Sequence, residues 1–267
     1  MVSKRDLEGY IKTIPPKPEV IKRVLDAISR SELREAGEIA EADPILKKYL
    51  QDLVNKPFYG FRNRVTSLPQ IFSILGVNGS QETVSHYLLS LLAPKKWHIF
   101  KLNSIVFQNL QATLGFYWRK TLEYENIDSK ELSATISLLP ATVILCDTIF
   151  YKSSDEVALI QDNSDFDFNI LLKEITGVSL FELIIFIGKY WGFSPSSLQI
   201  IKASANRAKI DDKKILRLGQ FMHLILFYVL SKEEFISTGL NGFIKFDIEY
   251  VMPIYDDFQK ILGDELL

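Results

Sequence analysis

The chain is short of the residues from which many catalytic centres are built. Its 267 residues include one cysteine, Cys146, so an internal disulfide is excluded. Only three histidines occur, His86, His98 and His223, and none of them has an adjacent aspartate or lies at ligand spacing from another. A histidine-rich site for two metal ions is therefore excluded, and we expect no metal cofactor.

Phosphate-binding and hydrolase motifs are also missing. There is no glycine-rich phosphate loop, no G-x-S-x-G elbow and no Cys-x-x-Cys pair. The longest apolar runs, Phe181 to Ile187 and Met222 to Leu230, are far shorter than the roughly 20 residues of a membrane helix. The charged N-terminus leads into no signal-peptide core. We expect a cytoplasmic protein without a membrane partner.

Positive and negative charges nearly balance each other in this chain. Lysine and arginine number 31 against 33 aspartates and glutamates, which gives a net charge of -2. This balance provides no global attraction to nucleic acid or to an anionic membrane. Hydrophobic residues make up 47% of the chain, which is enough to form a sizeable core.

The chain does contain many residues that typically start or end helices. Prolines at positions 15, 16 and 18 force an extended entry before an apolar stripe at helical spacing. Asp43 and Pro44 form an N-cap followed by proline at the first helical position. Ser67 and Gln70 have the spacing of a capping box, Gly76 is expected to end that helix, and Ser80 to cap the next one.

The same reasoning predicts helices throughout the rest of the chain. No stretch alternates like a half-buried strand for more than a few residues, and no internal repeat occurs. We therefore predict an all-α protein of one domain, residues 1–267, with an N-terminal helical lobe over 1–94 and a larger helical lobe over 95–267. In the second lobe, helices are expected at about 101–123, 129–151 with a break at Pro140, 179–191, 195–205, 212–230 and 247–262, and an acidic surface loop at 153–169.

The order of the N-terminal signals resembles the HDOD family. A proline-rich entry is followed by an Asp-Pro helix start, an Asn-x-x-Tyr/Phe-Gly loop and a Leu-Gly helix end. The residues that carry the match are Pro15, Pro18, Glu19, Val20, Ala40, Asp43, Pro44, Leu46, Asn55, Tyr59, Gly60, Leu75 and Gly76. The resemblance implies an HD-domain-like helical bundle, related to the HD phosphohydrolases, in a bacterial signalling protein.

The chain departs from the hydrolases at the position of their His-Asp pair. That position corresponds to Pro140 and Ala141, and neither side chain can bind a metal. HD hydrolases need converging histidines and aspartates to hold the metals that generate hydroxide. We therefore expect a degenerate, non-enzymatic domain. The alternative that remains open is a metal-dependent phosphohydrolase with an unusual carboxylate site.

The loop from Asn55 to Arg64 is the predicted contact surface for a protein partner. Aromatic residues and arginine are enriched at binding hot spots. We expect Phe58 and Tyr59 to turn inward, so the candidate partner-binding residues are Phe61, Arg62 and Arg64. The leading hypothesis is a signal-transduction scaffold that presents this surface, its helical faces and the cleft between its lobes to a partner.

A basic stretch offers a second alternative, which is binding of a nucleotide or nucleic acid. Such a site combines positive charge with an aromatic platform. A solvated surface is the simpler interpretation and is preferred here, so nucleic acid is not an expected partner. The residues concerned are Lys202, Arg207, Lys209, Lys213, Lys214 and Arg217.

Two further side chains are interpreted as structural. His223 lies on an apolar helix, where we expect a core histidine bonded to a carbonyl rather than a general base. Cys146 has apolar neighbours, which favour a protonated and unreactive thiol.

Overall fold

Regular structure in the described residues is entirely helical, which confirms the predicted all-α class. The computed structural model describes residues 2–55, 61–157, 167–206 and 209–263. Short 3-10 turns join several of the helices. The α-helices are α1 (Lys4–Thr13), α2 (Glu19–Ser29), α3 (Leu33–Ala40), α4 (Pro44–Val54), α5 (Leu68–Ser90), α6 (Ser104–Tyr124), α7 (Lys130–Ser133), α8 (Pro140–Phe150), α10 (Phe168–Thr176), α11 (Leu180–Tyr190), α12 (Pro195–Ser204), α13 (Lys213–Leu230), α14 (Glu233–Ile236), α15 (Ile248–Val251) and α16 (Tyr255–Leu262).

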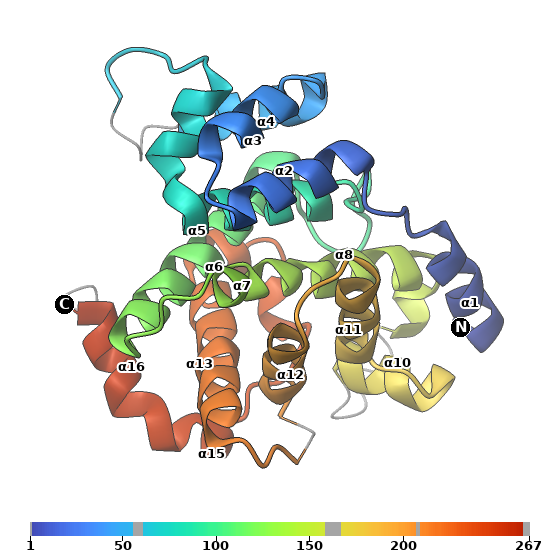
Figure 1. Ribbon diagram of the computed structural model, residues 1–267. Helices are drawn as coiled ribbons and strands as arrows, with labels where there is room; N and C mark the ends of the chain where they lie inside the picture. Colours follow the sequence, from blue (N-terminus) through green and yellow to red (C-terminus); the bar gives the residue numbers. More distant parts are fainter. Residues whose placement is uncertain (1, 56–60, 158–166, 207–208, 264–267) are drawn as a thin grey trace.

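The first lobe is built from α2, α3, α4 and the first part of α5, which lie together at the top of Figure 1. The Asp43 carboxylate accepts hydrogen bonds from the backbone N–H groups of Ile45 and Leu46, with Pro44 at the first helical position. This confirms the predicted start of α4. Gly37 on α3 faces the backbone of Pro69, where a Cβ would overlap, so α3 and α5 pack in close contact.

Helix α5 links the two lobes and is broken at Gly76, which has φ 66° and ψ −176°. The predicted interruption at this glycine is confirmed. Two predicted caps are wrong. Ser67 is the N-cap residue but its side chain makes no capping bond. The Ser80 hydroxyl donates instead to the carbonyl of Phe72 at 3.3 Å, across the break.

The second lobe surrounds α8, whose residues from Pro140 to Asp147 are all buried. Pro140 stands at the first position of α8, after a 3-10 turn, because proline lacks the N–H that an interior position requires. Within the described residues, one helical stretch, Lys130–Val157, is apolar and long enough to span a membrane. Because 83% of its most apolar window is buried inside the protein, it is accounted for as a core helix.

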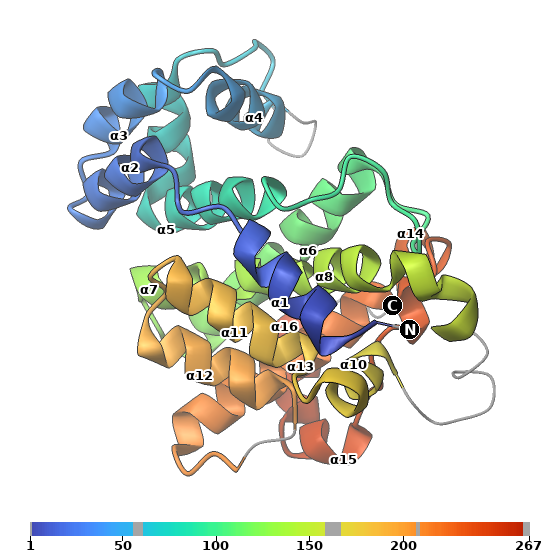
Figure 2. The ribbon, with the colours of Figure 1, turned by 90° about the vertical axis from the view of Figure 1, so that its right-hand side faces the viewer.

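Helix α1 is an element that the sequence analysis did not anticipate. Ser3 and Asp6 form a reciprocal capping box at its start. The helix contacts α8 and α10, so residues 4–13 lie on the second lobe although they precede the first in sequence (Figure 2). The connection back to α2 is fixed where the Trp191 indole N–H donates to the carbonyl of Pro15 at 3.1 Å.

Candidate functional site

A cleft opens where α5 and α6 face each other, with contributions from α4, α7 and α14. Its volume is about 1020 Å³. Residues of both lobes line it, so its shape depends on how α5 joins them. The apolar part of the lining consists of Leu53, Ile74, Leu75, Phe116, Tyr117, Leu122 and Ile127.

An ion pair crosses the cleft wall from α5 to α6. Arg119 Nη1 lies 2.5 Å from Glu82 Oε2, and only 3% of Glu82 is exposed. Burial raises the pKa of Glu82, and the charge of Arg119 opposes that effect. Gly115 makes the approach possible, because a Cβ at this position would overlap the Glu82 carboxylate.

His86 lies one helical turn after Glu82 and also lines the cleft. It is 5% exposed, and its Nε2 atom has no hydrogen-bond partner among the described residues. Burial, assisted by the positive charge of Arg119, lowers the pKa of His86 to about 3. The imidazole is therefore neutral near pH 7. Beside it, Gln111 donates through Nε2 to the His86 carbonyl at 3.2 Å, and the Gln111 Oε1 atom is without a partner in the same described part.

The remaining charged residues of the cleft lining are acidic. Glu123, Asp128 and Glu234 line the cleft together with the Glu82–Arg119 pair. Asn78 donates to Asp128 at 3.2 Å, and Asn109 donates to Glu234 at 2.8 Å. Arg119 is the one cation in the lining recorded for the described residues. The lining therefore carries a net negative charge.

Comparison with known proteins identifies the family. The model of the HDOD domain matches residues 14–207, which is most of the chain. The chain belongs to the HDOD family. The resemblance noted in the sequence is thereby confirmed. Among curated proteins, no sequence is significantly similar to this HDOD protein.

Two solved structures show the same fold at 14% identity. An HDOD domain protein of unknown function from Geobacter sulfurreducens has a TM-score of 0.64 and covers 99% of this chain and 97% of its own. A Shewanella amazonensis SB2B protein, provisionally named a phosphohydrolase, has a TM-score of 0.66 and covers 96% of each chain. At this identity the likeness concerns the fold alone.

The two residues predicted to stand at the His-Asp position lie in the core rather than in the cleft. Pro140 and Ala141 are buried at the start of α8, and neither lines the cleft. Across residues 2–55, 61–157, 167–206 and 209–263, no group of three or more His, Cys, Asp or Glu residues is placed to hold a metal ion. The donor set of an HD hydrolase is thus not assembled by these residues.

The predicted partner-binding residues lie on the segment that leads into α5. Phe61 is 43% exposed, and Arg62 and Arg64 are exposed as well. Arg64 Nη2 lies 3.6 Å from Asp52 Oδ1 on α4, which orients this arginine along the first lobe. Phe58 and Tyr59, expected to turn inward, lie outside the described residues.

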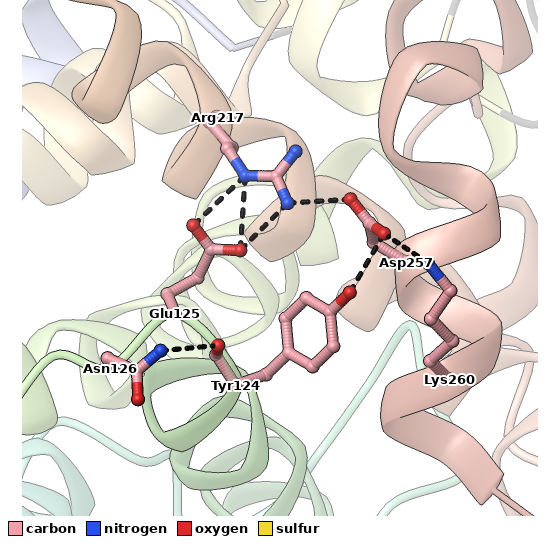
Figure 3. Close-up of polar contacts among 6 residues, drawn as sticks. All are labelled: Tyr124, Glu125, Asn126, Arg217, Asp257 and Lys260. Atoms are coloured by element: carbon pink, nitrogen blue, oxygen red, sulfur yellow. Dashed lines mark hydrogen bonds and ion pairs between the residues drawn. The ribbon is translucent and has the colours of Figure 1, made fainter.

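The predicted basic patch is divided by the structure. Lys202, Lys209, Lys213 and Lys214 are exposed, and Arg207 lies outside the described residues. Arg217 instead forms a bidentate pair with Glu125 at the end of α6 and bonds Asp257 on α16 at 2.7 Å (Figure 3). Because the Arg217 guanidinium is already bonded to these two carboxylates, we no longer count Arg217 among the residues of the patch that would contact a ligand.

The Arg217 cluster joins three helices of the second lobe. Asp257 also bonds Lys260 at 2.9 Å and the Tyr124 hydroxyl at 2.8 Å. The hydrogen bond from Arg217, followed by those from Lys260 and Tyr124, holds the pKa of Asp257 well below its usual range. A carboxyl group whose pKa is lowered by folding stabilises the folded state at any pH above its ordinary pKa. This contribution is lost as the pH falls through the lowered pKa. We therefore regard the cluster as a structural clamp between α6, α13 and α16.

Replacement of Arg217 with methionine tests the clamp. We expect the free energy of unfolding to fall by about 2 kcal/mol, since charge-assisted hydrogen bonds to two carboxylates are lost. The change is measured by urea denaturation at pH 7. Lys214→Met, at an exposed position of the same helix, is the control and should shift stability by less than about 0.5 kcal/mol. Equal effects of the two substitutions would contradict the clamp.

His223 has the structural role that the sequence indicates. Its Nδ1 lies 2.8 Å from the Ser204 carbonyl, and its Nε2 accepts the backbone N–H of Asp247 at 3.2 Å. Cys146 is fully buried, and burial raises the pKa of its thiol. Neither side chain lines the cleft.

The cleft residues Glu82 and Arg119 were not predicted from the sequence, and no role was predicted for His86. Two spacings carried a signal: Glu82 and His86, and Gly115 and Arg119, each four residues apart on one helix. These spacings place each pair on one face. They do not show that the two faces meet, since residues 82 and 119 belong to different helices.

Proposed function

We propose that this HDOD domain is a non-catalytic regulatory module of bacterial signal transduction that acts by binding a protein partner. The observation that carries the proposal is the burial of Pro140 and Ala141 at the former His-Asp position. These side chains have no atom that coordinates a metal, and they fill core volume. Metal-assisted phosphoester hydrolysis requires side chains that hold the metal.

The segment Phe61 to Arg64 is the proposed contact surface. It displays a large aromatic side chain beside arginines, which is the composition found at energetic hot spots of interfaces. It also lies between α4 and α5, so a partner bound there would contact the helix that connects the two lobes. Binding at this place is therefore suited to regulation through the relative position of the lobes.

Substitution of Phe61 with alanine tests this surface. We expect at least a tenfold loss of affinity for the partner, because truncating a hot-spot aromatic residue removes about 1.4 kcal/mol or more. Affinity purification from the native cell identifies candidates, and titration calorimetry with the purified candidate measures the loss. Arg62→Ala should weaken binding in the same direction.

The chain offers a matched control in Phe186→Ala. Phe186 on α11 is 45% exposed, close to the 43% of Phe61, and lies on the second lobe. A partner that binds this variant and the unmodified protein equally, but not Phe61→Ala, supports the assignment. Equal binding by all three proteins would contradict it. Turnover of phosphoesters or cyclic dinucleotides with Mg²⁺ or Mn²⁺ would overturn the non-catalytic assignment.

A further inference from the structure

We propose that the cleft between α5 and α6 is a binding site for a small, largely apolar organic cation. The chemical class is a protonated amine attached to an aromatic or aliphatic body. The proposal is independent of the partner surface at Phe61, because it concerns a different set of residues. It would remain in force if Phe61→Ala had no effect on any partner.

The size and lining of the cleft set the body of the ligand. A volume of about 1020 Å³ lies at the upper end of the range of small-molecule pockets. Its apolar lining comes from both lobes, with Leu53, Ile74 and Leu75 on one side and Phe116 and Leu122 on the other. An apolar body would be removed from water between the two helices.

The buried polar atoms indicate where a polar group of the ligand would be received. His86 lines the cleft and is only 5% exposed. Its Nε2 atom has no hydrogen-bond partner in the described part of the chain. Buried polar atoms in folded proteins are nearly always hydrogen-bonded, so this exception beside the cleft is an acceptor that a ligand could satisfy. In the tautomer protonated at Nδ1, it accepts from an uncharged N–H group of the ligand body, such as an indole N–H, because an ammonium group placed there would be repelled by Arg119.

Charge selects a cation over an anion. Glu82 and Arg119 compensate each other, and Glu123, Asp128 and Glu234 remain as unbalanced acidic groups of the lining. A cleft lined mainly by one sign of charge concentrates ligands of the opposite sign. Lys120 and Lys232 lie over the rings of Phe116 and Tyr117 but do not line the cleft, so the faces of these rings are not assigned to the ligand.

The test compares probes that share one ring system and differ in charge. Tryptamine is a cation at pH 7, indole is neutral, and indole-3-acetate is an anion. Titrations followed by nuclear magnetic resonance are expected to give affinity in that order, with tryptamine at least about tenfold tighter than indole-3-acetate. Shifts should map to α5 and α6. An order in which indole-3-acetate binds as tightly as tryptamine would overturn the proposal.

Two variants connect the binding to the cleft. Glu123→Gln removes one charge of the lining and should reduce the preference for tryptamine over indole-3-acetate by about threefold, whereas Glu8→Gln, on exposed α1, should leave it unchanged. Thr113→Trp fills the cleft and should abolish binding of all three probes. Tryptamine binding that persists in a folded Thr113→Trp protein, or that is absent in the unmodified protein, would refute the site.

Discussion

Replacement of Arg119 with methionine is expected to lower the free energy of unfolding by about 2–3 kcal/mol, because the buried Glu82 carboxylate loses its partner, although the Arg119 side chain itself is 38% exposed. Glu82 is 3% exposed and depends on Arg119 Nη1, 2.5 Å away, to compensate its charge. Without that cation the carboxylate must either stay charged in a desolvated wall or take up a proton. Urea denaturation at pH 7 measures the loss.

A second substitution shows whether the buried charge causes the loss. Glu82→Gln introduced together with Arg119→Met removes the carboxylate, so the double variant should recover most of the stability that Arg119→Met alone loses. Arg64→Met is the matched control, because Arg64 pairs with Asp52 in an exposed position and should cost less than about 1 kcal/mol. Similar losses for Arg64→Met and Arg119→Met would contradict the account.

Gly115→Ala should reproduce part of the same effect without changing any charge. The added Cβ would overlap the far end of the Glu82 side chain, so the carboxylate must move and its pairing with Arg119 must rearrange. Alanine is a better helix former than glycine, so the effect on helix propensity alone would be stabilising. A loss of stability in this variant therefore reports on the contact between Glu82 and Arg119.

The local structure of this domain could be predicted well from the sequence. Asp43 caps α4 as the Asp-Pro pair predicts, because a cap depends on residues within one turn of the chain. Gly76 interrupts α5 because it can adopt positive φ. The all-α class follows from such local rules. Ser67 fails because a capping spacing permits the bond without requiring it.

The cleft could not be predicted in the same way. Glu82 and Arg119 are 37 positions apart, and a charged residue on an amphipathic helix ordinarily faces water. Whether the two meet depends on how α5 and α6 are placed by the elements that both of them contact, α7 and the 3-10 turn Thr135–Leu138. It also depends on the missing side chain at Gly115, where a Cβ would overlap the Glu82 carboxylate. The assignment of positions 140 and 141 to the His-Asp pair stays a prediction, since it depends on the resemblance in sequence alone. The position of α1 on the second lobe also depends on contacts distant in sequence.

Acidification should destabilise the domain through His86 more steeply than through an ordinary histidine. The folded protein keeps His86 neutral until its lowered pKa of about 3, whereas the unfolded chain binds a proton near the ordinary value of 6.5. Between these values the unfolded state holds more protons, so stability falls as pH falls, by up to about 1.4 kcal/mol per pH unit. Above pH 6.5 the contribution of neutral His86 is fully present.

His86→Gln isolates this contribution. Glu82 and Arg119 face the same part of the cleft, and the raised pKa of Glu82 acts in the opposite direction, so the total pH dependence of the protein is a sum of several groups. The difference between the unmodified protein and His86→Gln removes the groups that both share. Denaturation at intervals from pH 7 to pH 4 should give a flatter curve for the variant.

The ring resonances of His86 provide a direct check that does not depend on unfolding. In the folded protein at pH 4, we expect the imidazole to remain in its neutral form, because protonation would place a charge in a buried site and would add a second positive charge near Arg119. Titration of this resonance near pH 6.5 would show that water or an anion reaches the ring. In that case the lowered pKa of His86 would be wrong. The assignment of Nε2 as an acceptor for a ligand would also be wrong, because both require a neutral and desolvated imidazole.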